Sequence, residues 1–180
     1  MRLILIVLLS LGLVAGCTPT TSTSSGVTAT GPDGQPLPTV YKIRASAEND
    51  IKFRMLDSVN ALRRASGAPE VRFNARLNAA AATHSRDMSA QNRPWHFGSD
   101  GSSPIDRVVR SGYSGRFVGE NISETYENEN ETLSAWMAQP STREVILDPR
   151  ATEMGFDWFQ EKNGKIWWTL VMGGATGLQG

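Results

Sequence analysis

Three short stretches near the C-terminus decide the fold class: MGFDWF at 154–159, NG at 163–164 and KIWWTLV at 165–171. The first and third stretches are rich in aromatic and β-branched residues, which is typical of β-strands. The Asn-Gly pair between them is the strongest short-range signal for a tight hairpin turn. The sequence therefore predicts a β-hairpin at this end of the chain.

The segments before the hairpin carry the periodicity of helices. Apolar residues recur three or four positions apart, as they do along one face of an α-helix. The clearest sets are Ile51, Met55, Val59 and Leu62, then Leu77, Ala81, His84 and Met88. We expect the first helix to be capped by Ser46 and the second to start near Asn74. Further helices are predicted from Ser103-Pro104, around 133–137 and over 141–147. Helices first and strands last favour an α+β fold with a small antiparallel sheet.

The N-terminus has the organisation of a lipoprotein signal peptide. Arg2 precedes an apolar run over 3–14, which is shorter than the roughly 20 apolar residues that a transmembrane helix needs. The run ends in LVAGC at 13–17, which resembles the lipobox cut by lipoprotein signal peptidase. Cys17 is the only cysteine, so the alternative of a disulfide has no partner within the chain. We expect Cys17 to carry acyl chains, palmitate among them, that anchor the protein in a membrane.

Composition divides the chain into three parts. Residues 1–16 are the predicted signal peptide, and 17–45 are the acylated cysteine and a flexible tether rich in Thr, Ser, Pro and Gly. Residues 46–180 are the predicted globular domain. The residue after Cys17 is Thr18 and not Asp. In a Gram-negative cell this favours the cell envelope, on the periplasmic side of the outer membrane.

The charge balance argues against a nucleic-acid partner. The chain has 18 basic and 18 acidic side chains, and loss of residues 1–16 would remove one basic residue and leave a net charge near −1. A nucleic-acid-binding domain normally carries a basic patch. A hydrophobic fraction of 39% is enough for a packed core, which excludes overall disorder. A small ligand, a peptide or an envelope component remains open as the partner.

The two histidines and one glutamate are the candidates for site chemistry. His84 lies on the apolar stripe of its helix, which favours a structural histidine hydrogen-bonded at the edge of the core. His96 lies in a predicted loop over 94–101, where it is either a site residue or an exposed neighbour of two buried aromatic rings. Glu120 follows a glycine at 119. It is either a carboxylate that holds one tautomer of His96 or a turn-forming acid.

Several segments together resemble the CAP superfamily in its bacterial form. This family comprises cysteine-rich secretory, antigen-five and pathogenesis-related proteins, and its domain is called the SCP domain. The resemblance covers about residues 50–173 and rests on the order and spacing of the segments. They are 55–63, 84–88, 96–101, 112–113, 119–122, 136–137, and 146–149 running into 152–155.

The resemblance implies an α-β-α sandwich with a cleft. In many members two histidines and two glutamates line this cleft and sometimes hold a divalent metal. His96 matches the first histidine and Glu120 the first glutamate, but Thr142 stands in place of the second histidine and Gln139 near the second glutamate. Because zinc normally takes three or four strong ligands, we expect no metal and no other cofactor here. The predicted binding cleft consists of His96, Glu120, Gln139 and Thr142.

These features favour a membrane-anchored CAP module that binds a ligand or partner without catalysis. Lipids, peptides and cell-wall fragments are all compatible with the resemblance. The alternative is a hydrolase, peptidase-like or nuclease-like, with His96 as general base and Glu120 orienting it. A second imidazole, which only His84 could supply, would favour the enzyme. A purely structural envelope protein would have no pocket near His96.

Overall fold

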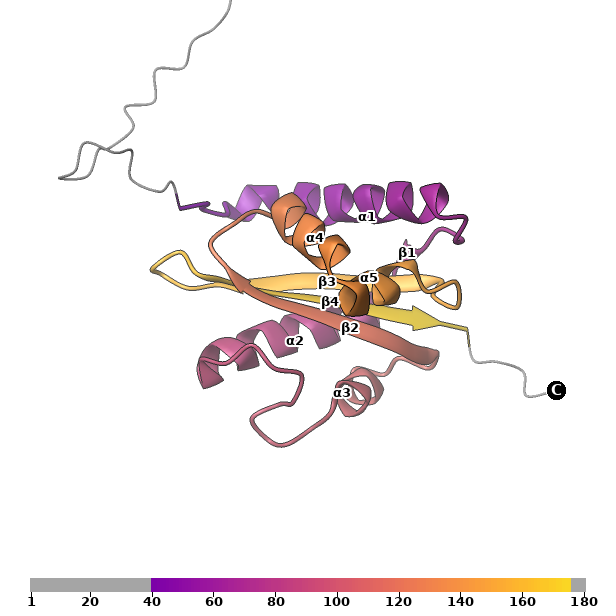
Figure 1. Cartoon of the computed structure of the whole chain (residues 1–180). Coiled ribbons are helices and arrows are strands. Elements are labelled where there is room, and N and C mark those ends of the chain that lie inside the picture. Colours follow the sequence, from indigo (N-terminus) through magenta and orange to yellow (C-terminus); the bar gives the residue numbers. More distant parts are fainter. Residues whose placement is uncertain (1–39, 176–180) are drawn as a thin grey trace, which may run out of the picture. The chain divides into compact units, whose positions relative to one another are not determined.

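The computed structural model describes residues 40–175, and Figure 1 shows how their elements are arranged. In chain order these are η1 (Ala45–Ala47), α1 (Glu48–Ala65), β1 (Arg72–Phe73), α2 (Ala75–Gln91), α3 (Pro104–Arg110), β2 (Arg116–Thr125), α4 (Glu129–Ala138), α5 (Pro140–Leu147), β3 (Glu153–Gln160) and β4 (Ile166–Gly174). The predicted signal peptide, Cys17 and the tether before residue 40 lie outside the described residues.

The strands form one sheet with the order β1-β3-β4-β2. The predicted C-terminal hairpin is confirmed as the antiparallel pair β3–β4. Its turn contains Asn163 and Gly164, and Gly164 has φ of +98°, a conformation that glycine adopts without steric cost. The three longer strands, β2, β3 and β4, are antiparallel to their neighbours, as expected. The short strand β1 pairs parallel with β3, so the sheet is mixed.

Helices cover both faces of the sheet. Figure 1 shows α2 and α3 on one face and α1, α4 and α5 on the other. Successive side chains of β4 alternate between these layers. Leu170 and Met172 belong to the larger core with α1, whereas Val171 packs with Leu77 of α2 in a smaller core. The α-β-α sandwich implied by the family resemblance is therefore confirmed.

Gly155 allows α2 to lie directly on β3. A Cβ atom at this position would collide with the backbone of Leu77 and Asn78. One face of α2 is thereby fixed against the sheet, and farther along the helix the hydroxyl of Ser85 donates to that of Thr169 on β4 at 2.9 Å. This packing also determines the position of His84, because His84 is the residue next to Ser85 on α2.

The helix starts follow side-chain capping at two of the predicted positions. Asn74 accepts hydrogen bonds from the first backbone N–H groups of α2. Ser103 and Asp106 form a reciprocal capping box at the start of α3, with Pro104 at its first position. The predicted cap at Ser46 is wrong. Ser46 lies inside η1, and Ala47 precedes α1 without a side-chain hydrogen bond.

Strand β2 covers a region for which the sequence patterns predict no strand. It lies at the edge of the sheet and pairs with β4 from Arg116 to Thr125, with Glu120 opposite Val171. Several of its residues are polar, and this hides the strand from a search for apolar alternation. The polar side chains find partners on the helices of both layers, as described below.

The ordered packing begins before residue 46. Tyr41 and Ile43 fall in the stretch predicted as tether, and their side chains pack against the larger core. None of the helices between residues 40 and 175 has the length and hydropathy needed to cross a membrane.

Candidate functional site

The site is built around Glu120 on the edge strand β2. Because Glu120 is opposite Val171, its side chain lies on the face of the sheet that α2 and α3 cover. The next residue, Asn121, points to the other face and donates to the backbone carbonyl of Thr142 in α5 at 2.8 Å. Glu120 is only 7% exposed, so its carboxylate needs partners to compensate for lost hydration.

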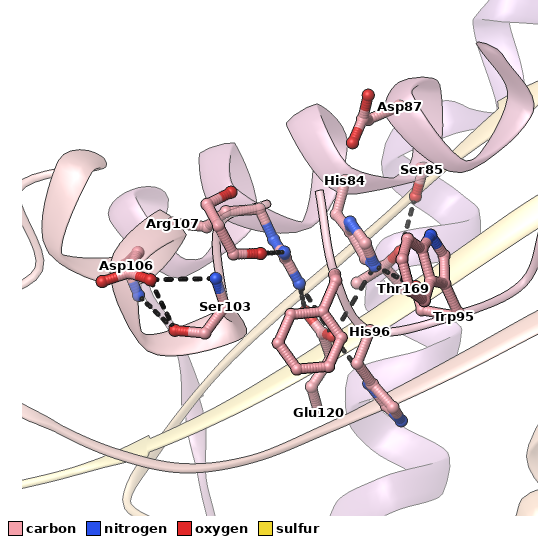
Figure 2. Close-up of polar contacts among 12 residues, drawn as sticks. His84, Ser85, Asp87, Trp95, His96, Ser103, Asp106, Arg107, Glu120 and Thr169 are labelled. Carbon is pink, nitrogen blue, oxygen red and sulfur yellow. Dashed lines mark hydrogen bonds and ion pairs between the residues drawn. The ribbon is translucent and has the colours of Figure 1, made fainter. Parts of the chain in front are cut away.

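Arg107 of α3 supplies the main partner. Its Nη2 atom donates to both carboxylate oxygens of Glu120 at 2.9 Å, and Nη1 donates to the carbonyl of Ser102 at 3.2 Å. Figure 2 shows the guanidinium reaching from α3 toward Glu120. The pair compensates both buried charges. Among the described residues, Nε of Arg107 has no hydrogen-bond partner.

His96 is the exposed member of the site. Its Nδ1 lies 2.9 Å from Oε1 of Glu120, and its side chain is 49% exposed. A carboxylate only accepts hydrogen bonds, so Nδ1 carries the proton. In the neutral ring, Nε2 is then an unprotonated acceptor. The contact therefore presents an imidazole in one defined tautomer at the protein surface.

His84 is the buried member. Its Nε2 lies 2.9 Å from the carbonyl oxygen of Trp95 and 3.7 Å from Oε1 of Glu120. The side chain is 0% exposed, and Nδ1 has no partner among the described residues. Burial lowers the pKa of His84, and the nearby Glu120 carboxylate opposes this shift with a smaller effect. His84 is buried and hydrogen-bonded, as expected for a structural histidine, and it also adjoins Glu120.

The end of α2 holds the loop that carries His96. Gln91 accepts from the indole N–H of Trp95 at 2.8 Å and donates to the carbonyl of Phe97 at 3.3 Å. Asp87 accepts from the backbone N–H of Ser99 at 2.7 Å. These contacts fix the loop on both sides of His96, and Figure 2 places Asp87 and His84 on the same helix above it.

Sequence reasoning missed Arg107, Gln91 and Asp87. Helical periodicity gives no signal for Arg107, because α3 buries this arginine while exposing its apolar residues Ile105 and Val109. Gln91 and Asp87 act through contacts with a loop that has no repeating pattern. The presence of polar side chains near the end of α2 is the signal that could have suggested Gln91 and Asp87.

Gln139 and Thr142, the other two residues of the predicted cleft, lie elsewhere. Gln139 is exposed at the junction of α4 and α5. The hydroxyl of Thr142 donates to the carbonyl of Trp136 at 2.6 Å. Within residues 40–175, no hydrogen bond or ion pair joins either residue to His96 or Glu120. The structure thus brings together His96 and Glu120, adds His84 and Arg107, and keeps Thr142 against the opposite face of β2.

Two of the groups that could bind a divalent metal ion at this site, Glu120 and His84, already have protein partners. Glu120 already accepts two hydrogen bonds from the positive charge of Arg107, which a cation would have to approach or displace. Nε2 of His84 is engaged with a carbonyl oxygen. Across the described part of the chain, no group of three or more His, Cys, Asp or Glu side chains is arranged to hold a metal.

Comparisons with known proteins agree with this fold. Residues 56–172 match the cysteine-rich secretory protein family, CAP. The chain is 28% identical over 120 residues to the uncharacterized protein YkwD of Bacillus subtilis, and the match covers 67% of this chain and 46% of YkwD. The chain therefore spans about half the length of that relative.

Solved structures give the same picture. An extracellular protein containing an SCP domain from Bacillus anthracis superposes with a TM-score of 0.66 at 20% identity, covering 74% of this chain and 45% of that one. An outer surface protein of Borrelia burgdorferi superposes with a TM-score of 0.63 at 16% identity, covering 77% of this chain and 100% of that one. At these identities the likeness establishes the fold alone. With the family match over 56–172, it leads to one conclusion: this chain belongs to the cysteine-rich secretory protein (CAP) family.

Proposed function

We propose that the protein is an extracytoplasmic, membrane-anchored CAP module that binds a ligand or partner at the surface around His96, without catalysis. The observation that carries the proposal is the clamp of Arg107 on Glu120. A general-base histidine becomes a cation during proton transfer, and a neighbouring carboxylate helps by stabilising that charge. Here Arg107 already compensates the charge of Glu120, so this carboxylate has little left to offer an imidazolium.

Recognition suits the same geometry. The half-exposed ring of His96 presents Nε2 as an acceptor, and the loop contacts of Gln91 restrict its motion. Preorganised polar groups reduce the entropy lost on binding. Trp95 and Phe97, whose ring centroids lie 5.6 Å apart, flank the histidine and offer apolar area for contact.

The placement outside the cytoplasm rests on the N-terminal sequence. The apolar run over 3–14 and the LVAGC stretch support secretion and acylation of Cys17. Two structures with the same fold belong to proteins described as extracellular and as an outer surface protein, which agrees with this placement. The membrane is then one partner of the chain, through the acyl chains on Cys17.

A hydrolase is the second candidate, and one observation favours it. His84 lies 3.7 Å from the carboxylate oxygen that also contacts His96, so two imidazoles share one acid. A second imidazole beside Glu120 is the feature expected of an enzyme. No hydroxyl or thiol group in residues 40–175 makes a hydrogen bond to His96, however, so a hydrolytic role would need an activated water molecule as nucleophile.

One NMR experiment separates the two candidates. The chain has only two histidines, so histidine-selective labelling gives two ring signals that variants can assign. A lysophospholipid, a short peptide and a soluble muropeptide are titrated into the full-length protein, and the same samples are analysed for cleavage. Binding without turnover shifts the His96 signal and leaves the probe intact.

The matched variants are His96→Asn and His96→Ala. Asparagine keeps a donor near the place of Nδ1 and loses Nε2. Because neither variant has a His96 signal, probe binding is measured by calorimetry, and both substitutions are expected to weaken it relative to wild type. Cleavage of a probe that disappears in both variants would establish the hydrolase instead, and no signal shift with any probe would count against the binding role.

The anchor has its own test. Metabolic labelling with a radioactive palmitate precursor is expected to mark the wild-type protein and not the Cys17→Ala variant. Equal labelling of both would end the claim of acylation at Cys17.

A further inference from the structure

A cavity lined by both apolar and polar groups lies between α2 and α3 and shares Arg107 with the His96 site. Its volume is about 380 Å³. Ala79, Ala80, Thr83 and Asp87 of α2 form one wall, the 99–102 turn forms another, and α3 closes it with Arg107 and Arg110. Neither histidine nor Glu120 lines it. The volume lies at the lower end of the range for small-molecule sites.

The lining offers acceptors, donors and groups that are both. Oδ2 of Asp87 accepts from the Ser99 N–H and from the side chain of Gln91, while Oδ1 has no partner in the described residues. The guanidinium of Arg110, 62% exposed, pairs with Asp100 through one nitrogen and keeps further N–H groups. The hydroxyl of Thr83 donates to the carbonyl of Ala79 at 2.9 Å and can still accept, and the hydroxyl of Ser99 can donate and accept. The two alanines provide a small apolar wall between these groups.

The charges of the cavity disfavour ions of either sign. An incoming anion such as phosphate would have to compete with Asp100 for Arg110 and would also face the carboxylate of Asp87. The guanidinium groups of Arg107 and Arg110 face an incoming cation. A neutral ligand with many hydroxyl groups meets neither penalty, because each hydroxyl can donate to a carboxylate and accept from a guanidinium.

We propose that the α2–α3 cavity is a binding site for a neutral carbohydrate of one or two rings. Asp87 accepts from the sugar hydroxyls, Arg110 donates to them, and the wall of Ala79 and Ala80 contacts the apolar face of a ring. Arg107 connects this cavity with the His96 site, since it lines the cavity and clamps Glu120. The Nε–H group of Arg107 is a buried donor that has no hydrogen-bond partner in residues 40–175.

The proposal is tested by calorimetric titration of the detergent-solubilised full-length protein. The probes are chitobiose and maltose, with inorganic phosphate and calcium chloride as ionic comparisons. We expect at least one of the two sugars to bind and neither ion to do so. Failure of both sugars to bind at millimolar concentration would overturn the proposal, and so would binding of phosphate or calcium at the cavity.

Two variants and a matched control locate the binding. Thr83→Trp fills the cavity from an exposed position of α2, and Asp87→Asn removes a charged acceptor, so each is expected to weaken sugar binding at least about tenfold. Ala90→Trp places the same bulky ring on an exposed position of α2 outside the cavity and is expected to leave the affinity unchanged. Circular dichroism checks that all three variants are folded. Full affinity in folded Thr83→Trp would show that the sugar binds elsewhere and refute the assignment.

Discussion

Arg107 donates from a single nitrogen, Nη2, to both carboxylate oxygens of Glu120, at 2.9 Å each. The two side chains are 5% and 2% exposed, so this ion pair lies out of water between α3 and β2. Such a pair contributes little net stability compared with apolar residues, but removal of one partner leaves the other charge buried without compensation. Substitution of either residue is therefore expected to disturb the site and to lower the stability of the fold.

The first prediction follows from this dependence. Arg107→Met is expected to lower the free energy of unfolding by about 3 kcal/mol, because Glu120 is left charged and buried. Urea denaturation, monitored by tryptophan fluorescence, measures the loss of unfolding free energy. The double variant Arg107→Met with Glu120→Gln removes both charges and is expected to recover a substantial part of it. A single variant that loses less than about 1 kcal/mol would contradict the role of the pair.

A second buried arginine fixes the other layer. Arg63 of α1 is 0% exposed and donates to the carbonyl oxygens of Pro69, Ile146, Asp148 and Ala151. It thus ties α1 to the segment between α5 and β3. Burial lowers its pKa, and the nearby Asp148 carboxylate opposes the shift.

We expect Arg63→Met to lower the free energy of unfolding by about 3 kcal/mol, because several buried carbonyls lose their donor at once. The neighbouring Arg64 is a matched control. It is 60% exposed and, among the described residues, pairs with the exposed Glu70 alone, so Arg64→Met is expected to cost at most about 0.5 kcal/mol. Thermal denaturation of the two variants side by side checks the difference, and equal losses would refute the assignment.

Local patterns predicted the helices and the hairpin because their causes are local. The stripe from Ile51 to Leu62 and the capping residues Asn74 and Ser103 act within a few positions of the chain. Strand β2 was missed because its pairing with β4 joins residues far apart in sequence, and its polar side chains are satisfied by helices of both layers.

The same distinction explains the site. The approach of His96 to Glu120 was expected from the family resemblance, and the structure has that contact. Whether Thr142 can join them depends on the strand alternation at Glu120 and Asn121, which no sequence pattern revealed. Arg107 was missed because its burial is decided by the charge on Glu120, a contact made only in the folded chain.

The buried His84 makes stability depend on pH in a defined direction. Its pKa lies below the usual 6.5, so the unfolded chain binds a proton there more readily than the folded chain. This histidine costs no stability well above pH 6.5. As pH falls through 6.5, protonation of the unfolded state lowers the free energy of unfolding, until the folded-state pKa is passed.

The test compares wild type with His84→Gln between about pH 8 and pH 5. Glutamine keeps a donor near the place of Nε2 and does not titrate. The wild type is expected to lose stability relative to the variant only in the acidic half of this range. Other titrating groups cancel in the comparison, so parallel curves would show that His84 is not the group responsible.

The last prediction concerns the loop that presents His96. Gln91 holds Trp95 through its indole N–H and Phe97 through its carbonyl, and these two residues flank His96 in the chain. Gln91→Ala removes both contacts. The control is Ser89→Ala, two residues earlier on α2, which removes a hydrogen bond to Glu161 and leaves the loop contacts in place. We expect the indole N–H of Trp95 to exchange with solvent at least about tenfold faster in Gln91→Ala, and at an unchanged rate in Ser89→Ala.

If ligand recognition depends on a fixed His96, Gln91→Ala also weakens the His96 signal shift on binding, while the free energy of unfolding falls by only about 1 kcal/mol. Unchanged exchange at Trp95 would mean that the loop is held by its other contacts, at His84 and Asp87, and that Gln91 is dispensable.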